Sequence, residues 1–122
     1  MIYGNVDKNN FTDFISAYPV LIVNSKKADT SIAEEINYNA RRTILAYDAK
    51  NVYVIAIEGS GMTFNKIQDF LIKMNVTHAI NLDGGGSTKI LENGSSITSS
   101  IYNRAVDNVI AFYLKPKTIY RV

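Results

Sequence analysis

The chain has 122 residues, of which 47% are hydrophobic and 20% charged, with no cysteine, one histidine and a net charge of +2. This composition predicts one domain over 1–122 with a core of its own, and it excludes disulfides, thiolate metal sites and multi-histidine centres. The weak net charge argues against duplex nucleic acid as a partner, and no apolar run is long enough to cross a membrane. Because the chain does not begin with a secretory signal, we expect a cytoplasmic protein, and we predict neither a metal nor a cofactor.

The first predicted elements are a helix and a strand. Apolar residues at helical spacing between Asn10, a good N-cap, and Pro19 predict an amphipathic helix over 11–18. The apolar run 19–23 predicts a buried strand. The polar, aperiodic residues 28–39 predict a loop that lies over a site.

The middle of the chain predicts a hairpin followed by a helix and another strand. Residues 41–47 and 52–58 are strand candidates that flank a polar connection of hairpin length. Thr63 is an N-cap for a helix whose apolar positions keep helical spacing as far as Met74. A crossover of this length predicts that 52–58 and the next strand, 78–82, are parallel neighbours.

The last predicted elements are a second hairpin and a terminal strand. The pair Asn93-Gly94 between 88–91 and 95–97 is a strong hairpin signal, and 106–114 predicts the final strand. Together these elements predict a single compact α+β domain, with a mixed sheet of about six or seven strands and two helices.

The most distinctive stretch follows the strand at 78–82 and joins an acid, three glycines and two hydroxyls: Asp83, Gly84, Gly85, Gly86, Ser87 and Thr88. Three consecutive glycines indicate a positive-φ turn or a ligand close to the backbone. Such a loop can cradle phosphate oxygens, although its spacing is neither that of a Walker loop nor that of a dinucleotide fingerprint. Asp83 suits binding of sugar hydroxyls or acid–base chemistry, and its simpler interpretation is a turn carboxylate that bonds its own loop.

Two arginines and a second acid complete the candidate site. Arg42 begins one strand and Arg104 precedes another, and a guanidinium binds phosphate as a fork, although either side chain can also be a solvated charge. Arg41 points away from Arg42 in a strand, so only one of them faces a given site, and the sequence leaves open which one. Glu58 ends the central strand and is expected at the same sheet edge as Asp83, a pairing typical of glycosidases.

Three segments of the chain resemble, in order, the C-terminal half of the phosphodiester glycosidase domain over roughly residues 19–114: "NARRTILAYD", "EGSGMTFNKIQDFLIKMNVTHAINLDGGGSTKI" and "NRAVDNVIAFYL". In this family the corresponding motifs surround a pocket in which a sugar is cleaved from a phosphodiester. The resemblance implies ligand-binding roles for Arg42 with Thr43, for the residues from Asp83 to Ser87 and for Arg104. We add their polar neighbours Thr88 and Asn103.

The chain also departs from this family. The family's N-terminal strands and an Asn-Gly-Gly-Phe-Phe-like segment have no counterpart here, Glu58-Gly59 stands where Asp-Gly is usual, and Ala105 replaces a common proline. Self-association can complete such a half-pocket, so we expect a homo-oligomer, a dimer or larger, with residues 1–18 at the interface.

The size and motif set are also similar to the Thoeris anti-defence sponges of phages, which bind cyclic ADP-ribose isomers without cleaving them. The resemblance implies a phage or prophage protein that sequesters a small anionic nucleotide-sugar signal and so inhibits host defence. The alternative is a phosphodiester glycosidase with Asp83 or Glu58 as acid or base. A third interpretation is a component of the phage particle.

Overall fold

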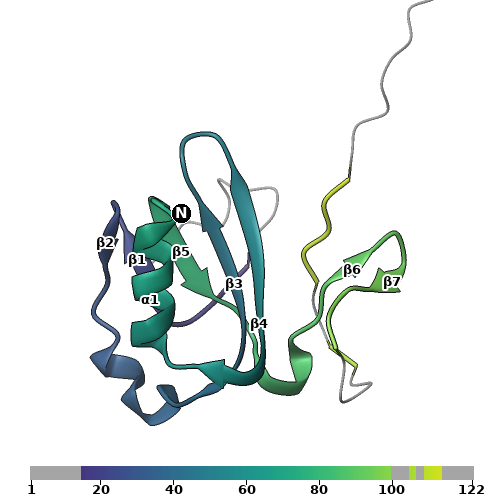
Figure 1. Cartoon of the computed structure of the whole chain (residues 1–122), viewed down its shortest axis with the longest axis horizontal. Helices are drawn as coiled ribbons and strands as arrows, with labels where there is room; N and C mark the ends of the chain where they lie inside the picture. Colours follow the sequence, from purple (N-terminus) through teal and green to yellow (C-terminus); the bar gives the residue numbers. More distant parts are fainter. Residues whose placement is uncertain (1–14, 100–104, 107–108, 114–122) are drawn as a thin grey trace, which may run out of the picture.

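Five strands form the main sheet of the computed structural model, which describes residues 15–99, 105–106 and 109–113 (Figure 1). Their order across the sheet is β2-β1-β5-β3-β4, and every neighbouring pair is antiparallel. A separate two-stranded hairpin lies beyond β4. The strands are β1 (Val20–Val23), β2 (Lys26–Lys27), β3 (Ala40–Tyr47), β4 (Val52–Met62), β5 (His78–Asn81), β6 (Leu91–Glu92) and β7 (Ser95–Ser96).

One α-helix, α1 (Phe64–Lys73), packs on one face of this sheet (Figure 1). The hydroxyl of Thr63 accepts the Lys66 N–H at 3.5 Å, as expected of an N-cap. Buried Gln68 donates through its Nε2 to the carbonyls of Leu21 and Ala28 at 2.9 and 2.8 Å, which ties the helix to the first strands. The fully buried core joins the helix to the sheet: Leu21, Ile22, Ala33, Ile44, Ala46, Phe64, Ile67, Leu71, Val76 and Ala79.

Two short 3-10 helices connect these elements, η2 (Ser31–Ile36) before β3 and η3 (Gly85–Ser87) after β5. The first lies within 28–39, so the segment predicted as a loop is partly helical. The second is formed by the glycine-rich stretch itself. None of the described helices is both long and apolar enough to span a membrane.

The structure confirms the α+β class, the strands at 19–23, 41–47, 52–58 and 78–82, and the helix after Thr63. The predicted parallel pairing of 52–58 with 78–82 is wrong. Strand β3 lies between β4 and β5 and is antiparallel to both, so the two strands run parallel without being neighbours. The reason is the tight β3–β4 hairpin, which already occupies the adjacent position, so the crossover through α1 has to pass over β3.

The two ends of the described chain also differ from prediction. Residues 15–18 are not helical, and 11–14 lie outside the described residues. The Asn93-Gly94 turn is confirmed, with φ of 50° and 81°. The final strand predicted over 106–114 is wrong for residues 106 and 109–113, which form no strand in the described structure, because a strand exists only where a second strand supplies hydrogen bonds.

Two glycines near the end of β4 allow a matched test of this fold. Gly59 and Gly61 both have positive φ, 63° and 74°. A Cβ on Gly59 would meet nothing within 4 Å, whereas a Cβ on Gly61 would lie 2.0 Å from the carbonyl carbon of Ala40. Gly59→Ala should lower the free energy of unfolding by about 1–2 kcal/mol, the penalty of the left-handed backbone. Gly61→Ala should lower the free energy of unfolding by a further ~1–3 kcal/mol, because its Cβ would clash with β3.

Urea denaturation of the two variants measures this difference directly. Equal losses for both glycines would contradict the close approach of β4 to Ala40.

Candidate functional site

A cleft of about 510 Å³ opens where β5 ends and the glycine-rich stretch begins. Arg42, Asn81 and Asp83 supply polar groups to its lining, and Gly84 and Gly85 supply bare backbone. Tyr18 and Tyr38, which are 45% and 60% exposed, add two aromatic side chains. The cleft therefore combines a cation, hydrogen-bonding groups and aromatic rings, a set that suits a small polar ligand.

Arg42 is the most unusual residue of the cleft because it is a cation with only 6% of its surface exposed. Its Nη2 donates to the backbone carbonyls of Ile36 and Tyr38, and its guanidinium lies 4.3 Å from the ring centre of Phe64. Burial lowers the pKa of Arg42, yet an arginine in a protein stays protonated. Its Nε is buried without a partner, and among the described residues no carboxylate forms an ion pair with it.

The glycine-rich stretch approaches the backbone of β3 at Gly84. A Cβ there would lie 2.6 Å from the carbonyl oxygen of Arg41, so only glycine allows the contact. Gly85 has a φ of 58° with open space around it. The N–H groups of Ser87 and Thr88 donate to Gly84 and Gly85 at 3.0 and 3.3 Å. These two amides are therefore engaged within the loop, so fewer N–H groups remain for phosphate oxygens than the sequence predicts.

Asp83 is exposed at the edge of the cleft, where its Oδ1 accepts the Gly84 N–H at 2.8 Å. This geometry is the turn carboxylate that the simpler interpretation of the sequence describes. The bond engages one carboxylate oxygen, so the other remains an acceptor for ligand hydroxyls.

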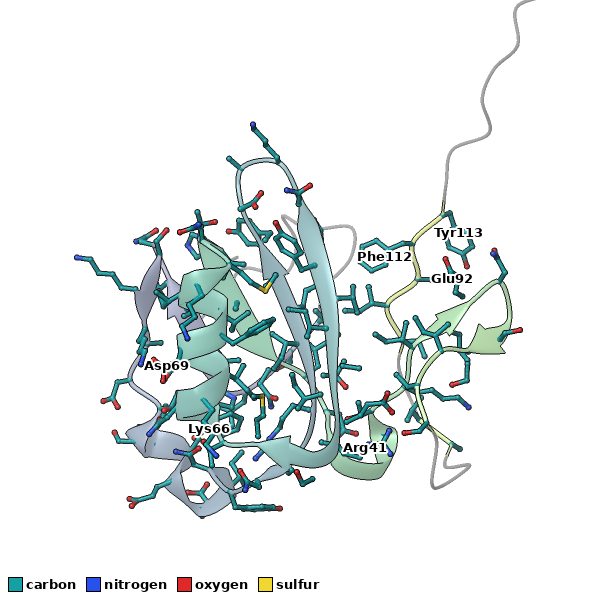
Figure 2. All side chains as sticks on the ribbon, viewed as in Figure 1. Arg41, Lys66, Asp69, Glu92, Phe112 and Tyr113 are labelled. Carbon is teal, nitrogen blue, oxygen red and sulfur yellow. The ribbon has the colours of Figure 1, made fainter. Side chains whose placement is uncertain are left out.

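Arg41, labelled in Figure 2, forms a separate network with Glu58. Arg41 Nη2 lies 3.2 Å from Glu58 Oε1 and donates to the carbonyls of Thr88 and Ser99 at 3.3 and 2.6 Å. The same carboxylate oxygen accepts the N–H and the hydroxyl of Ser99, both at 2.6 Å. The Ser99 hydrogen bonds, aided by Arg41, hold the pKa of Glu58 below its ordinary value. The network fastens both ends of the β6–β7 hairpin to the sheet.

Strand β3 therefore divides the residues predicted for the site. Arg42 lines the cleft, whereas the side chains of its neighbours Arg41 and Thr43 lie on the other face of the strand. Glu58 is not part of the cleft lining. The hydroxyls of Thr43, Ser87 and Thr88 are buried without hydrogen-bond partners, and Asn103 and Arg104 lie outside the described residues.

Sequence analysis missed Asn81, which is 4% exposed. Its Nδ2 donates to the Tyr18 carbonyl at 2.9 Å, and its Oδ1 is buried without a partner beside the cleft. The available signal was an asparagine on the same side of its strand as the buried Ala79. Among the described residues, no group of acidic, histidine or cysteine side chains is arranged to hold a metal ion.

Comparison with known proteins places the chain in one family. The sequence profile of the phosphodiester glycosidase family matches residues 2–113, so the chain belongs to this family. It is 34% identical over 70 residues to human N-acetylglucosamine-1-phosphodiester alpha-N-acetylglucosaminidase, and 35% identical over 65 residues to the bovine protein. These matches cover 53% and 49% of this chain but only 14% and 12% of the relatives.

Solved structures show a similar fold over more of the chain than the human and bovine sequence matches cover. A hypothetical protein from Synechocystis has a TM-score of 0.66 at 25% identity, over 75% of this chain and 19% of that one. The zebrafish N-acetylglucosamine-1-phosphodiester alpha-N-acetylglucosaminidase catalytic domain, auto-inhibited by its pro-peptide, has a TM-score of 0.60 at 25% identity. That match covers 69% of this chain and 34% of the zebrafish one, so the chain corresponds to a minor part of both structures.

The Glu58 network predicts a pH-dependent anchor for the hairpin. Because the folded-state pKa of Glu58 is lowered, its stabilising effect is present above the ordinary pKa of 4.5 and is lost as the pH falls through the lower folded value. Glu58→Gln should therefore reduce the melting temperature at neutral pH, and the gap to the wild type should close in acid. Amide exchange at Ser99 should accelerate in the variant.

Asp48→Asn is the matched control, since Asp48 has a pKa lowered to about 2 by hydrogen bonds within the β3–β4 turn. Asp48→Asn should change how the melting temperature depends on pH in acid, without changing amide exchange at Ser99. Unaltered exchange at Ser99 in Glu58→Gln would contradict the anchoring role.

Proposed function

We propose that the cleft binds a small anionic ligand containing a sugar and a phosphodiester, and that Arg42 is the group that meets the phosphate. The observation that carries this proposal is the burial of Arg42 without a carboxylate partner. A buried charge is costly unless it is paired, and a phosphate oxygen would supply the missing counter-charge. Both carbonyl partners bind Nη2, so the buried Nε is a donor of the guanidinium that they do not use.

The other groups of the cleft match the remaining parts of such a ligand. Asn81 Oδ1 and the Asp83 carboxylate are acceptors for sugar hydroxyls, and the negative charge of Asp83 disfavours a phosphate on its own side. Tyr18 and Tyr38 offer flat faces for a sugar ring or a base. Gly84 and Gly85 let the ligand approach the backbone closely.

We further propose that the ligand is a cyclic nucleotide-sugar of the cyclic ADP-ribose isomer type and is held without cleavage. Most glycosidases use a pair of carboxyl groups that flank the scissile bond. Of the two acids expected here, Asp83 lines the cleft, whereas Glu58 is engaged by Arg41 and Ser99 and has a lowered pKa, which makes it a poor general acid. In a phage protein, such binding would inhibit a host defence that signals through this ligand.

Hydrolysis is the second candidate, and family membership together with the exposed Asp83 favours it. The human and bovine relatives are named for a sugar 1-phosphodiester and for removal of N-acetylglucosamine from it. In this case Asp83 would act as acid or base on a ligand whose phosphate lies at Arg42.

Substitution of Arg42 tests the binding proposal. Arg42→Gln should weaken binding of a cyclic ADP-ribose isomer by roughly 2–5 kcal/mol, a loss of about 30-fold or more, if the guanidinium meets phosphate. Isothermal calorimetry measures the difference. Arg41→Gln is the matched control, because the neighbouring arginine faces the Glu58 network and should leave the affinity nearly unchanged. Equal losses for both arginines would place the phosphate elsewhere.

The fate of the bound ligand separates the two candidates. Protein incubated with a cyclic ADP-ribose isomer and then denatured should release the ligand intact, as mass spectrometry of the supernatant would record. A sugar 1-phosphodiester with an activated leaving group should likewise remain uncleaved. Turnover of either compound, abolished by Asp83→Asn in a folded variant, would instead establish hydrolysis and reject sequestration.

A further inference from the structure

Asn81 is a buried amide whose orientation is fixed by its neighbours. Its Nδ2 donates to the Tyr18 carbonyl oxygen at 2.9 Å. A carbonyl oxygen can only accept hydrogen bonds, so the amide nitrogen has to face Tyr18 and the Oδ1 has to face away from it. The backbone holds the same arrangement, because the Tyr18 N–H donates to the Asn81 carbonyl at 3.1 Å and the Asn81 N–H donates to the Pro19 carbonyl at 3.0 Å. The direction of Oδ1 therefore follows from the fold.

The Oδ1 of Asn81 is a buried acceptor that has no hydrogen-bond partner among the described residues, and Asn81 lines the cleft. An unpaired buried acceptor costs free energy unless water or a ligand supplies a donor. Gln68 is also a buried amide, and its Nε2 donates to the carbonyls of Leu21 and Ala28, yet no buried atom of its side chain lacks a partner. The unpaired acceptor is therefore a feature of the cleft and not of every buried amide in this protein.

Asn81 and Arg42 lie on the same face of the sheet as diagonal neighbours. Asn81 is opposite Ile44 in the pairing of β5 with β3, and Arg42 precedes Ile44 by two residues. Residues two apart on a strand share a face, and diagonal neighbours on adjacent strands are typically about 7–8 Å apart. The unpartnered Nε of Arg42 and the unpartnered Oδ1 of Asn81 therefore give one cleft a buried donor with positive charge and a buried neutral acceptor.

We propose that Asn81 is the specificity-determining residue of the cleft, and that its Oδ1 accepts a hydrogen bond from a sugar hydroxyl next to the phosphodiester. This inference rests on the proposed function, which places the phosphate at Arg42, and it adds the group that the ligand must carry beside the phosphate. A ligand with this hydroxyl pairs both buried atoms at once. A ligand without it excludes water from Oδ1 and leaves the acceptor unpaired, so the cleft selects the hydroxylated sugar over its deoxy analogue.

Asp83 cannot make the same selection, although it is also an acceptor in the lining of the cleft. Its carboxylate is exposed, so water can still hydrate it when a ligand lacks a hydroxyl. The unpaired acceptor that penalises a deoxy ligand therefore arises only where the acceptor is buried. The amide of Asn81 is also neutral, so it can lie near a phosphate without the repulsion that a carboxylate would cause.

A comparison of ligands with the wild-type protein tests this assignment. Isothermal calorimetry is carried out with a cyclic ADP-ribose isomer and with its singly deoxygenated analogues. Removal of one particular ribose hydroxyl should weaken binding about tenfold to a hundredfold, whereas removal of the others should have little effect. Equal affinities for all the compounds would overturn the assignment and leave the phosphate at Arg42. A parent compound that does not bind at all would overturn the proposed function and this inference with it.

Substitution of Asn81 identifies the acceptor. Asn81→Ala should bind the parent compound more weakly and should no longer distinguish it from the discriminated analogue. Gln68→Ala is the matched control, because it removes a buried amide that does not line this cleft and should keep the full preference. A folded Asn81→Ala variant that still prefers the hydroxylated ligand would reject the role of Asn81.

A measurement on the wild type replaces the variant if Asn81→Ala does not fold. The side-chain amide resonances of Asn81 in the ¹⁵N-labelled protein should shift more with the parent compound than with the discriminated analogue, because only the parent bonds Oδ1. Equal shifts with both compounds would also reject the assignment.

Discussion

The contact between Gly84 and the backbone of β3 is the constraint on which the rest of the site depends. It brings the loop after β5 so close to Arg41 that a single added carbon would lie 2.6 Å from its carbonyl oxygen. At this same point the alternation of β3 sends Arg42 to the helix side and Arg41 to the other. The loop is therefore held against a strand that supplies one arginine to the cleft and another to the hairpin.

The two arginines have opposite electrostatic surroundings. Arg41 has the Glu58 carboxylate and the carbonyls of Thr88 and Ser99 as partners, so its charge is balanced within the protein, although its Nε, like that of Arg42, has no partner. Arg42 is more deeply buried but has only carbonyls and aromatic rings as partners. Carbonyls and rings stabilise a cation without neutralising it. A ligand with negative charge would therefore gain most at Arg42, which is why the proposed phosphate position lies in the cleft.

Local signals in the sequence predicted most of the fold and the glycine-rich part of the site. The Thr63 cap, the Asn93-Gly94 turn and the apolar period of α1 depend on neighbours along the chain, so they could be recognised without a structure. The place of β3 between β4 and β5 and the pairing of Glu58 with Ser99 depend on contacts far apart in sequence. The sequence spacing predicted Glu58 at the same sheet edge as Asp83, as part of one site. No local pattern indicates that Glu58 binds Arg41 and Ser99 outside the cleft.

The Arg41 network fastens the glycine-rich loop and the β6–β7 hairpin to the end of β4. The Arg41 guanidinium donates to the carbonyl of Thr88, directly after η3, and to the carbonyl of Ser99, after β7. Glu58, near the end of β4, pairs with Arg41 and accepts two hydrogen bonds from Ser99. Neither Arg41 nor Glu58 lines the cleft, whereas Arg42 does. The two neighbouring arginines of β3 therefore have separate tasks: Arg41 holds the hairpin in place, and Arg42 supplies the positive charge of the cleft.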